Sequence, residues 1–185
     1  NNMFQDEKPT ITAYWKALWD NDALYVLVSV IDDDHWPAWE AGGRWFKYDQ
    51  VELYLDINTV LADGLGPGNK GSGHYQVQPQ FIPEGSGLVQ PLAVSEYRPG
   101  GSYCYVLTEN NYVFEYALDY QSFKNKDDVF LSAEDFKALE KIGFDVTIID
   151  QDEGKTTDRQ RAVWRNKGDV DECYNNMDDA GTITL

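Results

Sequence analysis

Aromatic and acidic side chains come together around one candidate strand of this chain. Trp45, Phe46 and Tyr48 lead directly into the segment 51–56 (VELYLD), in which every second residue is apolar. In a strand, this alternation places the carboxylate of Glu52 on the face opposite the apolar residues. Flat rings stack on the C–H faces of a sugar, and carboxylates accept hydrogen bonds from its hydroxyls. The pattern indicates a sugar-recognition surface, with the alternative that the rings only cap the edge of a β-sandwich core.

Polar residues recur in the middle of other candidate strands. Gln76 lies in the alternating segment 74–78, and Glu115 lies in the segment 112–118. Glu and Gln are disfavoured in mid-strand positions unless that face is solvated or the side chains are paired. Together with Glu52 they indicate one binding face, whereas ordinary solvated outer faces are the alternative for each residue taken singly.

The composition narrows the classes of ligand. The chain carries 32 acidic and 15 basic residues, which gives a formal net charge of −17. Such a surface repels phosphate backbones and anionic lipids, so we expect neither nucleic acid nor membrane insertion. It suits a neutral ligand and hard cations such as calcium. With 6 Trp and 12 Tyr, some rings must lie at the surface, where they usually mark recognition sites.

Acidic residues cluster at two places that directly follow candidate interior strands. Neither cluster has the spacing of a DxDxDG calcium loop, and solvated loop charge is the alternative. Because both clusters follow interior strands, we expect them to share one edge of the fold. The predicted ligands of a structural Ca²⁺ are Asp32, Asp33, Asp34, Asp150 and Asp152.

Signals for catalysis are weak. The chain has no GxSxG, HExxH or P-loop motif, and only His35 and His74 could act as imidazole bases. An acidic chain always offers carboxylate pairs of the kind that glycoside hydrolases use, so their presence decides nothing. We therefore predict a protein that is not an enzyme. Cys104 and Cys173 could form a disulfide or remain thiols, and their spacing does not decide between the two.

The periodicity predicts one domain over residues 1–185, built as an antiparallel β-sandwich of immunoglobulin or jelly-roll type with one short helix. The helix is expected over 132–141, with Ser132 and Asp135 at capping-box spacing. A glycine-rich excursion is expected over 59–73. The predicted strands are 11–18, 24–31, 49–56, 74–78, 88–97, 102–107, 112–118, 142–150, 163–164 and 182–185.

Several short motifs follow one another in a familiar order. They run from LWD and LYV near the start, through DQVELYLD, HYQV and YVFE, to IGFDV and the closing GTITL. In this order they resemble the family 9 carbohydrate-binding modules, which are β-sandwiches often attached to xylanases. The resemblance extends from Ala17 to Leu185.

The resemblance implies a calcium-stabilised sandwich that holds a sugar, often the reducing end of a chain such as xylan or cellulose, between two aromatic rings. The positions that it assigns to the sugar site are Trp45 and Phe46 (first ring), Glu52, Gln76, Asp171 and Tyr174 (second ring). This chain departs from the family pattern at three points. Gln76 stands where the best-known member has an arginine, Tyr174 stands for a tryptophan, and the insert 34–44 adds Trp36 and Trp39.

The function implied is non-catalytic sugar binding by a secreted module, located extracellularly, in the periplasm or at the cell surface. Such a module would be covalently linked to a polysaccharide-degrading enzyme such as an endoxylanase. The chain begins at NNMFQDEKP, which reads like a trimmed N-terminus, so the lack of a visible signal peptide says little. The alternatives are a glycoside hydrolase domain and a haem-binding, electron-transfer sandwich of the DOMON type, whose axial ligands would come from Met3, Met177, His35 and His74.

Overall fold

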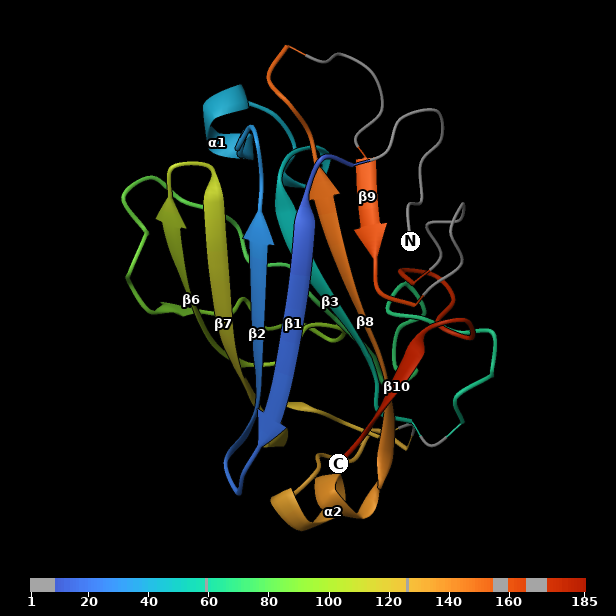
Figure 1. Cartoon of the computed structure of the whole chain (residues 1–185). Coiled ribbons are helices and arrows are strands. Elements are labelled where there is room, and N and C mark those ends of the chain that lie inside the picture. The colour runs from blue at the N-terminus through green and yellow to red at the C-terminus, as the bar shows by residue number, and fades with distance from the viewer. Residues whose placement is uncertain (1–8, 59, 126, 155–159, 166–172) are drawn as a thin grey trace.

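Two antiparallel sheets face each other in this chain (Figure 1). The computed structural model describes residues 9–58, 60–125, 127–154, 160–165 and 173–185. The first sheet has the order β1-β2-β7-β6-β5. Its strands are β1 (Thr12–Trp19), β2 (Ala23–Ile31), β5 (Gln90–Pro91), β6 (Gly101–Thr108) and β7 (Asn111–Asp119).

The second sheet carries the aromatic and acidic segment in its interior. It has the order β10-β8-β3-β4, and β9 also pairs with β8. Its strands are β3 (Gln50–Asp56), β4 (His74–Val77), β8 (Lys141–Asp150), β9 (Gln160–Val163) and β10 (Gly181–Thr184). The predicted antiparallel β-sandwich is therefore confirmed.

The helices are short and lie outside the two sheets. The predicted capping box is present at α2 (Ala133–Ala138): the Asp135 backbone N–H donates to Ser132 Oγ, and the Ser132 backbone N–H donates to Asp135 Oδ2. A second helix, α1 (Ala38–Ala41), follows β2 and has no counterpart in the prediction of one helix. The described residues also contain two 3₁₀ turns, η1 (Trp45–Lys47) and η2 (Tyr120–Ser122). None of the helices in the described ranges is long and apolar enough to cross a membrane.

The predicted strand 88–97 was wrong over most of its length. Only Gln90 and Pro91 form a ladder with β6, and the Leu92 N–H adds one bond to the Gly101 carbonyl before the chain folds back in a turn between Ser95 and Arg98. Beyond Leu92 the chain leaves the first sheet and reaches the free edge of β4. There the backbone N–H of Gln76 donates to the carbonyl of Tyr97, at 2.9 Å. This crossing places the segment 92–99 beside the second sheet.

The core fills the space between the sheets, and β3 is buried on both faces. Val51, Leu53 and Leu55 point into the main core, as their alternation predicts. On the opposite face, Tyr54 packs against Cys173 and Met177 in a small separate cluster. Every residue of β3 is buried, because segments outside the sheets cover its polar face. The carboxylate-bearing face thus lies beneath other segments of the chain.

Candidate functional site

A chain of hydrogen bonds runs across the covered face of β3 and β4. The register places Tyr54 opposite Gln76, and Gln76 Nε2 donates to the Tyr54 hydroxyl at 3.0 Å. Tyr54 in turn donates to Glu52 Oε2 at 2.6 Å, and Gln78 Nε2 donates to Glu52 Oε1 at 3.0 Å. Burial, and then the charge of Glu52, raises the pKa of Tyr54 well above its usual range, so the phenol keeps its proton for Glu52. These bonds fix the floor of the site.

Aromatic residues from distant segments surround this floor. Trp45 and Phe46 come from η1, and their rings lie perpendicular to each other with centroids 5.4 Å apart. Tyr97 comes from the segment that crosses to β4, and Tyr174 comes from the C-terminal part of the chain. Together they enclose a cavity of about 380 Å³. Its lining residues are Trp45, Phe46, Glu52, Tyr54, Gln76, Gln78, Tyr97, Arg98, Arg161 and Tyr174.

The structure brings five of the six predicted sugar-site residues to this one cavity, namely Trp45, Phe46, Glu52, Gln76 and Tyr174. Asp171, the sixth, lies outside the described residues. Glu115 does not join them, because it is exposed on β7 in the other sheet. Trp36 and Trp39 of the insert also stay away from the cavity lining: Trp36 packs edge-on against Tyr48, and Trp39 is 44% exposed on α1.

Two arginines that the sequence analysis did not predict also line the cavity. Arg98 Nη2 donates to Gln78 Oε1 at 3.3 Å, and its guanidinium lies 5.9 Å from the Trp45 ring centroid. Arg161, from β9, is buried at the same cavity. A guanidinium is therefore present here although Gln76 stands where the family pattern has an arginine. No sequence motif predicts either arginine, because the position of each at the cavity depends on which segments the fold brings to the edge of β4 and to β8.

The glycine-rich segment holds the loop that carries Tyr174. The Gly68 N–H donates to the Tyr174 carbonyl at 2.7 Å, and the Met177 N–H donates to the Leu65 carbonyl at 2.8 Å. A Cβ atom at Gly66 would lie 2.7 Å from the Asn175 carbonyl carbon, so only glycine permits this close approach. The predicted excursion thus serves as a support for one wall of the cavity.

Residues 1–185 match the sequence model of a family described as "Carbohydrate family 9 binding domain-like". The chain belongs to this family. A carbohydrate-binding module has no catalytic role of its own, so the prediction of sugar binding by a non-catalytic sandwich is confirmed at the level of the family. The haem-binding and glycoside hydrolase alternatives are not favoured by this assignment.

Solved structures of family 9 modules share the fold of this one. A carbohydrate-binding module of family 9 from Caldicellulosiruptor kristjanssonii in complex with glucose aligns with a TM-score of 0.61 and 18% identity, over 97% of this chain and 78% of that one. A second structure of a family 9 module from the same organism, in complex with cellotriose, aligns equally well over 97% and 77% of the two chains. No curated protein sequence matches the chain.

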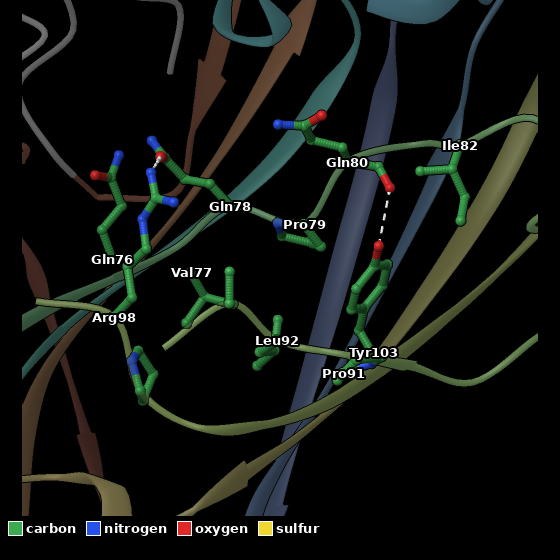
Figure 2. A pocket seen from close by; sticks show the side chains of 12 residues that line it. Gln76, Val77, Gln78, Pro79, Gln80, Ile82, Pro91, Leu92, Arg98 and Tyr103 are labelled. Atoms are coloured by element: carbon green, nitrogen blue, oxygen red, sulfur yellow. Dashed lines mark hydrogen bonds between the residues drawn. The ribbon is translucent and has the colours of Figure 1, made fainter. Parts of the chain in front are cut away.

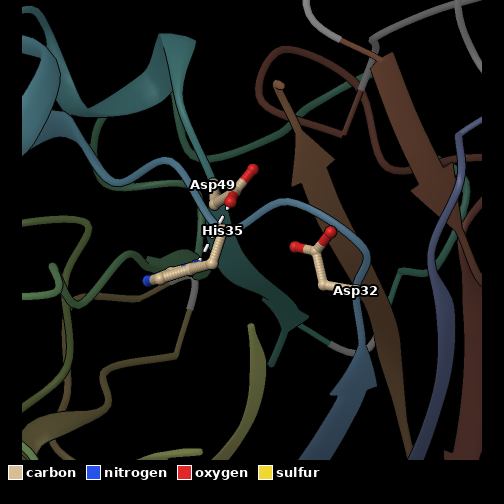
Figure 3. Close-up of side chains that lie close together, drawn as sticks. All are labelled: Asp32, His35 and Asp49. Carbon is tan, nitrogen blue, oxygen red and sulfur yellow. Dashed lines mark ion pairs between the residues drawn. The ribbon is translucent and has the colours of Figure 1, made fainter. Parts of the chain in front are cut away.

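A second group of polar side chains in this family 9 module lies where β2 ends and β3 begins. Ligand atoms of Asp32, His35 and Asp49 all lie within 4.8 Å of one another (Figure 3). His35 Nδ1 is 3.2 Å from Asp49 Oδ2. Burial, and then the charge of Asp49, raises the pKa of Asp32 to about 8. Burial also raises the pKa of Asp49 to about 8, and the charge of Asp150 contributes to this rise.

The two acidic loops nominated for calcium do meet in space. The Glu153 backbone N–H donates to Asp34 Oδ2 at 2.9 Å, which joins the loop after β8 to the loop after β2. Among the residues that the structure describes, neither Asp32 Oδ2 nor Asp150 Oδ1 receives a hydrogen bond, although both atoms are buried. Asp33 is exposed, and Asp152 lies in the loop that follows Asp150, the last residue of β8. The sequence analysis missed Asp49, because it reads as the first residue of a strand, and considered His35 as a base or a haem ligand and not as part of this group.

The second histidine of the module belongs to another buried group. His74 Nε2 lies 3.5 Å from Asp56 Oδ1 and 3.8 Å from Asp63 Oδ1. Its Nδ1 is 2.9 Å from Ser72 Oγ. Burial raises the pKa of Asp56 to about 7 and lowers the pKa of His74. Met177 packs against Tyr54 and Cys173, and Met3 lies outside the described residues, so the axial ligands considered for haem gain no support here.

Proposed function

We propose that the cavity over β3 and β4 binds a glucose- or xylose-based saccharide. The observation that carries this proposal is that five residues from distant parts of the chain, all predicted for the sugar site, line one cavity of about 380 Å³. The family assignment adds to it, as do the two similar modules solved with glucose and with cellotriose. We infer that binding at this site is the function of the chain and that no bond of the sugar is broken.

The geometry offers a sugar two kinds of contact. The rings of Trp45, Phe46 and Tyr174 supply apolar surface against which the C–H groups of a pyranose can pack. The floor supplies the carboxylate of Glu52 as acceptor and the guanidinium of Arg98 as donor, and hydrogen bonds to charged groups are the stronger ones. Shallow sites of this kind reach roughly −5 to −8 kcal/mol, which corresponds to micromolar or weaker dissociation constants.

Ring truncation tests this assignment. Because the rings carry the apolar share of binding, Phe46→Ala or Tyr174→Ala should raise the dissociation constant for cellobiose or xylobiose at least tenfold, measured by calorimetry. Trp39→Ala is the matched control, since Trp39 is an exposed ring that does not line the cavity. Unchanged affinity in both cavity variants would remove the site assignment. Unfolding of Phe46→Ala would instead mean that the ring only caps the core.

A structural calcium ion is the second function that we propose, and it rests on the buried acids at the ends of β2, β3 and β8. Asp32, Asp49 and Asp150 offer carboxylate oxygens, the ligand type that Ca²⁺ prefers, and two of these oxygens receive no hydrogen bond within the described residues. Burying several like charges without a cation is costly. Asp34 and Asp152, which flank these carboxylates, complete the set, and His35 would orient Asp49.

Thermal unfolding tests the calcium site. A ligand at 100 times its dissociation constant stabilises the native state by ~2.7 kcal/mol, which raises Tm by roughly 5 to 10 °C for a chain of this size. Calcium should therefore raise Tm relative to chelator, and Asp32→Asn should reduce the shift. Asp22→Asn, at an exposed turn, is the control. Coincident melts in calcium, magnesium and chelator would show that the loops are only solvated charge.

We further propose that the chain works as a secreted module, linked covalently to a polysaccharide-degrading domain such as an endoxylanase. The support for this context is the family resemblance, because such modules raise the local concentration of an attached enzyme at its substrate. The full-length protein should hydrolyse insoluble xylan or cellulose faster than the same protein lacking residues 1–185. Equal rates for both would contradict the proposed context without affecting the sugar site.

A further inference from the structure

A second hollow adjoins the aromatic cavity along the edge of β4. It has a volume of about 220 Å³ and shares Gln76, Gln78 and Arg98 with the aromatic cavity (Figure 2). The two hollows therefore meet at the Arg98–Gln78 pair, whose side chains are joined by a hydrogen bond of 3.3 Å. The second hollow, called the glutamine groove below, lies between residues 76–82 and residues 91–99.

The glutamines that line the glutamine groove are regularly spaced in the sequence, and only some of them also line the aromatic cavity. In the segment 76–80 (QVQPQ), glutamines occupy every second position. In an extended chain such residues point to the same side and are spaced by about 7 Å. Gln76 and Gln78 already belong to the aromatic cavity, while Gln80 is exposed and lines only the groove. The row of amides therefore continues beyond the aromatic rings.

The walls of the groove are fixed in place before any ligand arrives. Gln50 Nε2 donates to the Pro79 carbonyl, and the Tyr103 hydroxyl donates to the Gln80 carbonyl at 3.1 Å (Figure 2). The opposite wall includes Pro91 and Pro99, whose rings restrict the backbone. A preformed wall costs less conformational entropy on binding than a mobile loop.

We propose that the glutamine groove is a further subsite for the same saccharide chain, so that the module recognises oligosaccharides longer than the aromatic cavity alone accommodates. This inference rests on the proposed function of the aromatic cavity. Amides both donate and accept hydrogen bonds, which suits sugar hydroxyls, and Leu92 and the prolines supply apolar surface beside them. Among the described residues that line the groove none carries a carboxylate, although the whole chain has a net charge of −17. Continuity with the aromatic cavity identifies the occupant as the rest of a bound chain.

Chain-length dependence of affinity tests this subsite. Calorimetry on the whole chain would compare the disaccharide and the tetrasaccharide of the cello- and xylo-oligosaccharide series. The tetrasaccharide should bind the unmodified protein more tightly than the disaccharide. Gln80→Ala removes one hydrogen-bonding group from the groove, so the tetrasaccharide dissociation constant should rise about threefold to tenfold while that of the disaccharide stays unchanged. Gln90→Ala, which alters a glutamine outside the groove, should change neither.

A second variant tests the groove by filling it. Ala93 is an exposed lining residue, so Ala93→Leu should weaken tetrasaccharide binding selectively, whereas Val94→Leu, at an exposed neighbour outside the lining, should not. Equal affinity of the unmodified protein for disaccharide and tetrasaccharide would overturn the subsite. So would a Gln80→Ala effect of the same size on both ligands. If neither disaccharide bound the unmodified protein, the proposed function itself would fail, which is a distinct result.

Discussion

Replacing Glu52 by glutamine tests whether the floor of the aromatic cavity is a hydrogen-bond network that depends on the carboxylate. Glu52 is 2% exposed and accepts from both the Tyr54 hydroxyl and Gln78 Nε2. A glutamine at position 52 keeps one acceptor and presents an NH₂ group to one of these two donors. Gln78 cannot turn its amide to compensate without losing the bond that its Oε1 accepts from Arg98. Tyr54 already accepts from Gln76, so its own proton would lose its acceptor.

The expected loss of stability follows from the number of hydrogen-bond partners that the substitution removes. The substitution leaves one buried donor without an acceptor, which costs about 1–3 kcal/mol of the free energy of unfolding. For a chain of this size a loss of about 2 kcal/mol lowers Tm by roughly 4 to 8 °C. The carboxylate is also the acceptor for sugar hydroxyls, so binding should weaken by about 1–2 kcal/mol, a factor of roughly 5 to 30 in the dissociation constant.

Two measurements on the same variants separate the outcomes. Thermal unfolding reports the network, and calorimetry with cellobiose or xylobiose reports the sugar contact. Glu115→Gln, at an exposed site on the other sheet, should change neither. Tyr54→Phe combined with Glu52→Gln should cost less than the sum of the single changes, because both remove the same bond. A Glu52→Gln variant with unchanged Tm and unchanged affinity would refute the network and its role in binding. A lower Tm with full affinity would leave Glu52 a purely structural role.

Two further predictions concern residues outside the cavity lining, namely Gly66 and Asp56. Gly66→Ala places a methyl group 2.7 Å from the Asn175 backbone, so the loop bearing Tyr174 must shift. The dissociation constant for the sugar, measured by calorimetry, should therefore rise several-fold. Unchanged affinity would mean that the loop is not a rigid support. Because the pKa of Asp56 is about 7 in the native state and about 3.9 when unfolded, its contribution to stability is present below pH 4 and is lost as pH rises to about 7. Asp56→Asn should remove this loss. In urea unfolding, the free energy of unfolding of the variant should rise by roughly 2–4 kcal/mol relative to that of the unmodified protein between pH 4 and pH 7.5. A difference between the two proteins that stays constant across this pH range would contradict the prediction.

Alternation and turn signals were enough to predict most of the sandwich. The segment 142–150 became β8, and the segment 102–107 became the middle of β6, because each alternates or is apolar over a strand's length and is bounded by turn residues. The failure at 88–97 has a local cause that was readable, since a proline within an extended run favours a short edge strand, which is what Pro91 forms in β5. Helix α1 has four residues, too few for a helical period to be visible.

The candidate site was predictable only as far as local patterns reach. Glu52 and Gln76 lie on strands whose alternation fixes the face on which they lie, and the resemblance supplied Phe46 and Tyr174. Arg98 lies on an irregular segment, and a single backbone bond from Gln76 to Tyr97 brings it to β4. No periodicity encodes such a contact, because it depends on where a chain without regular structure crosses between sheets. The same limit applies to Asp49 in the acidic group.

The covered polar face of β3 is itself an argument for function. A strand buried on both faces is most stable with apolar residues on both, since every buried polar group must find partners. Here the face away from the core carries Glu52 and Tyr54, and their partners are Gln76 on the neighbouring strand β4 and Gln78 just beyond its end. Apolar residues of similar size would fill this place without any network and at no cost in unpaired polar groups. These polar side chains therefore do not improve the stability of the fold. They lie beneath aromatic rings that can pack against a sugar, so we attribute their presence to sugar binding and not to folding.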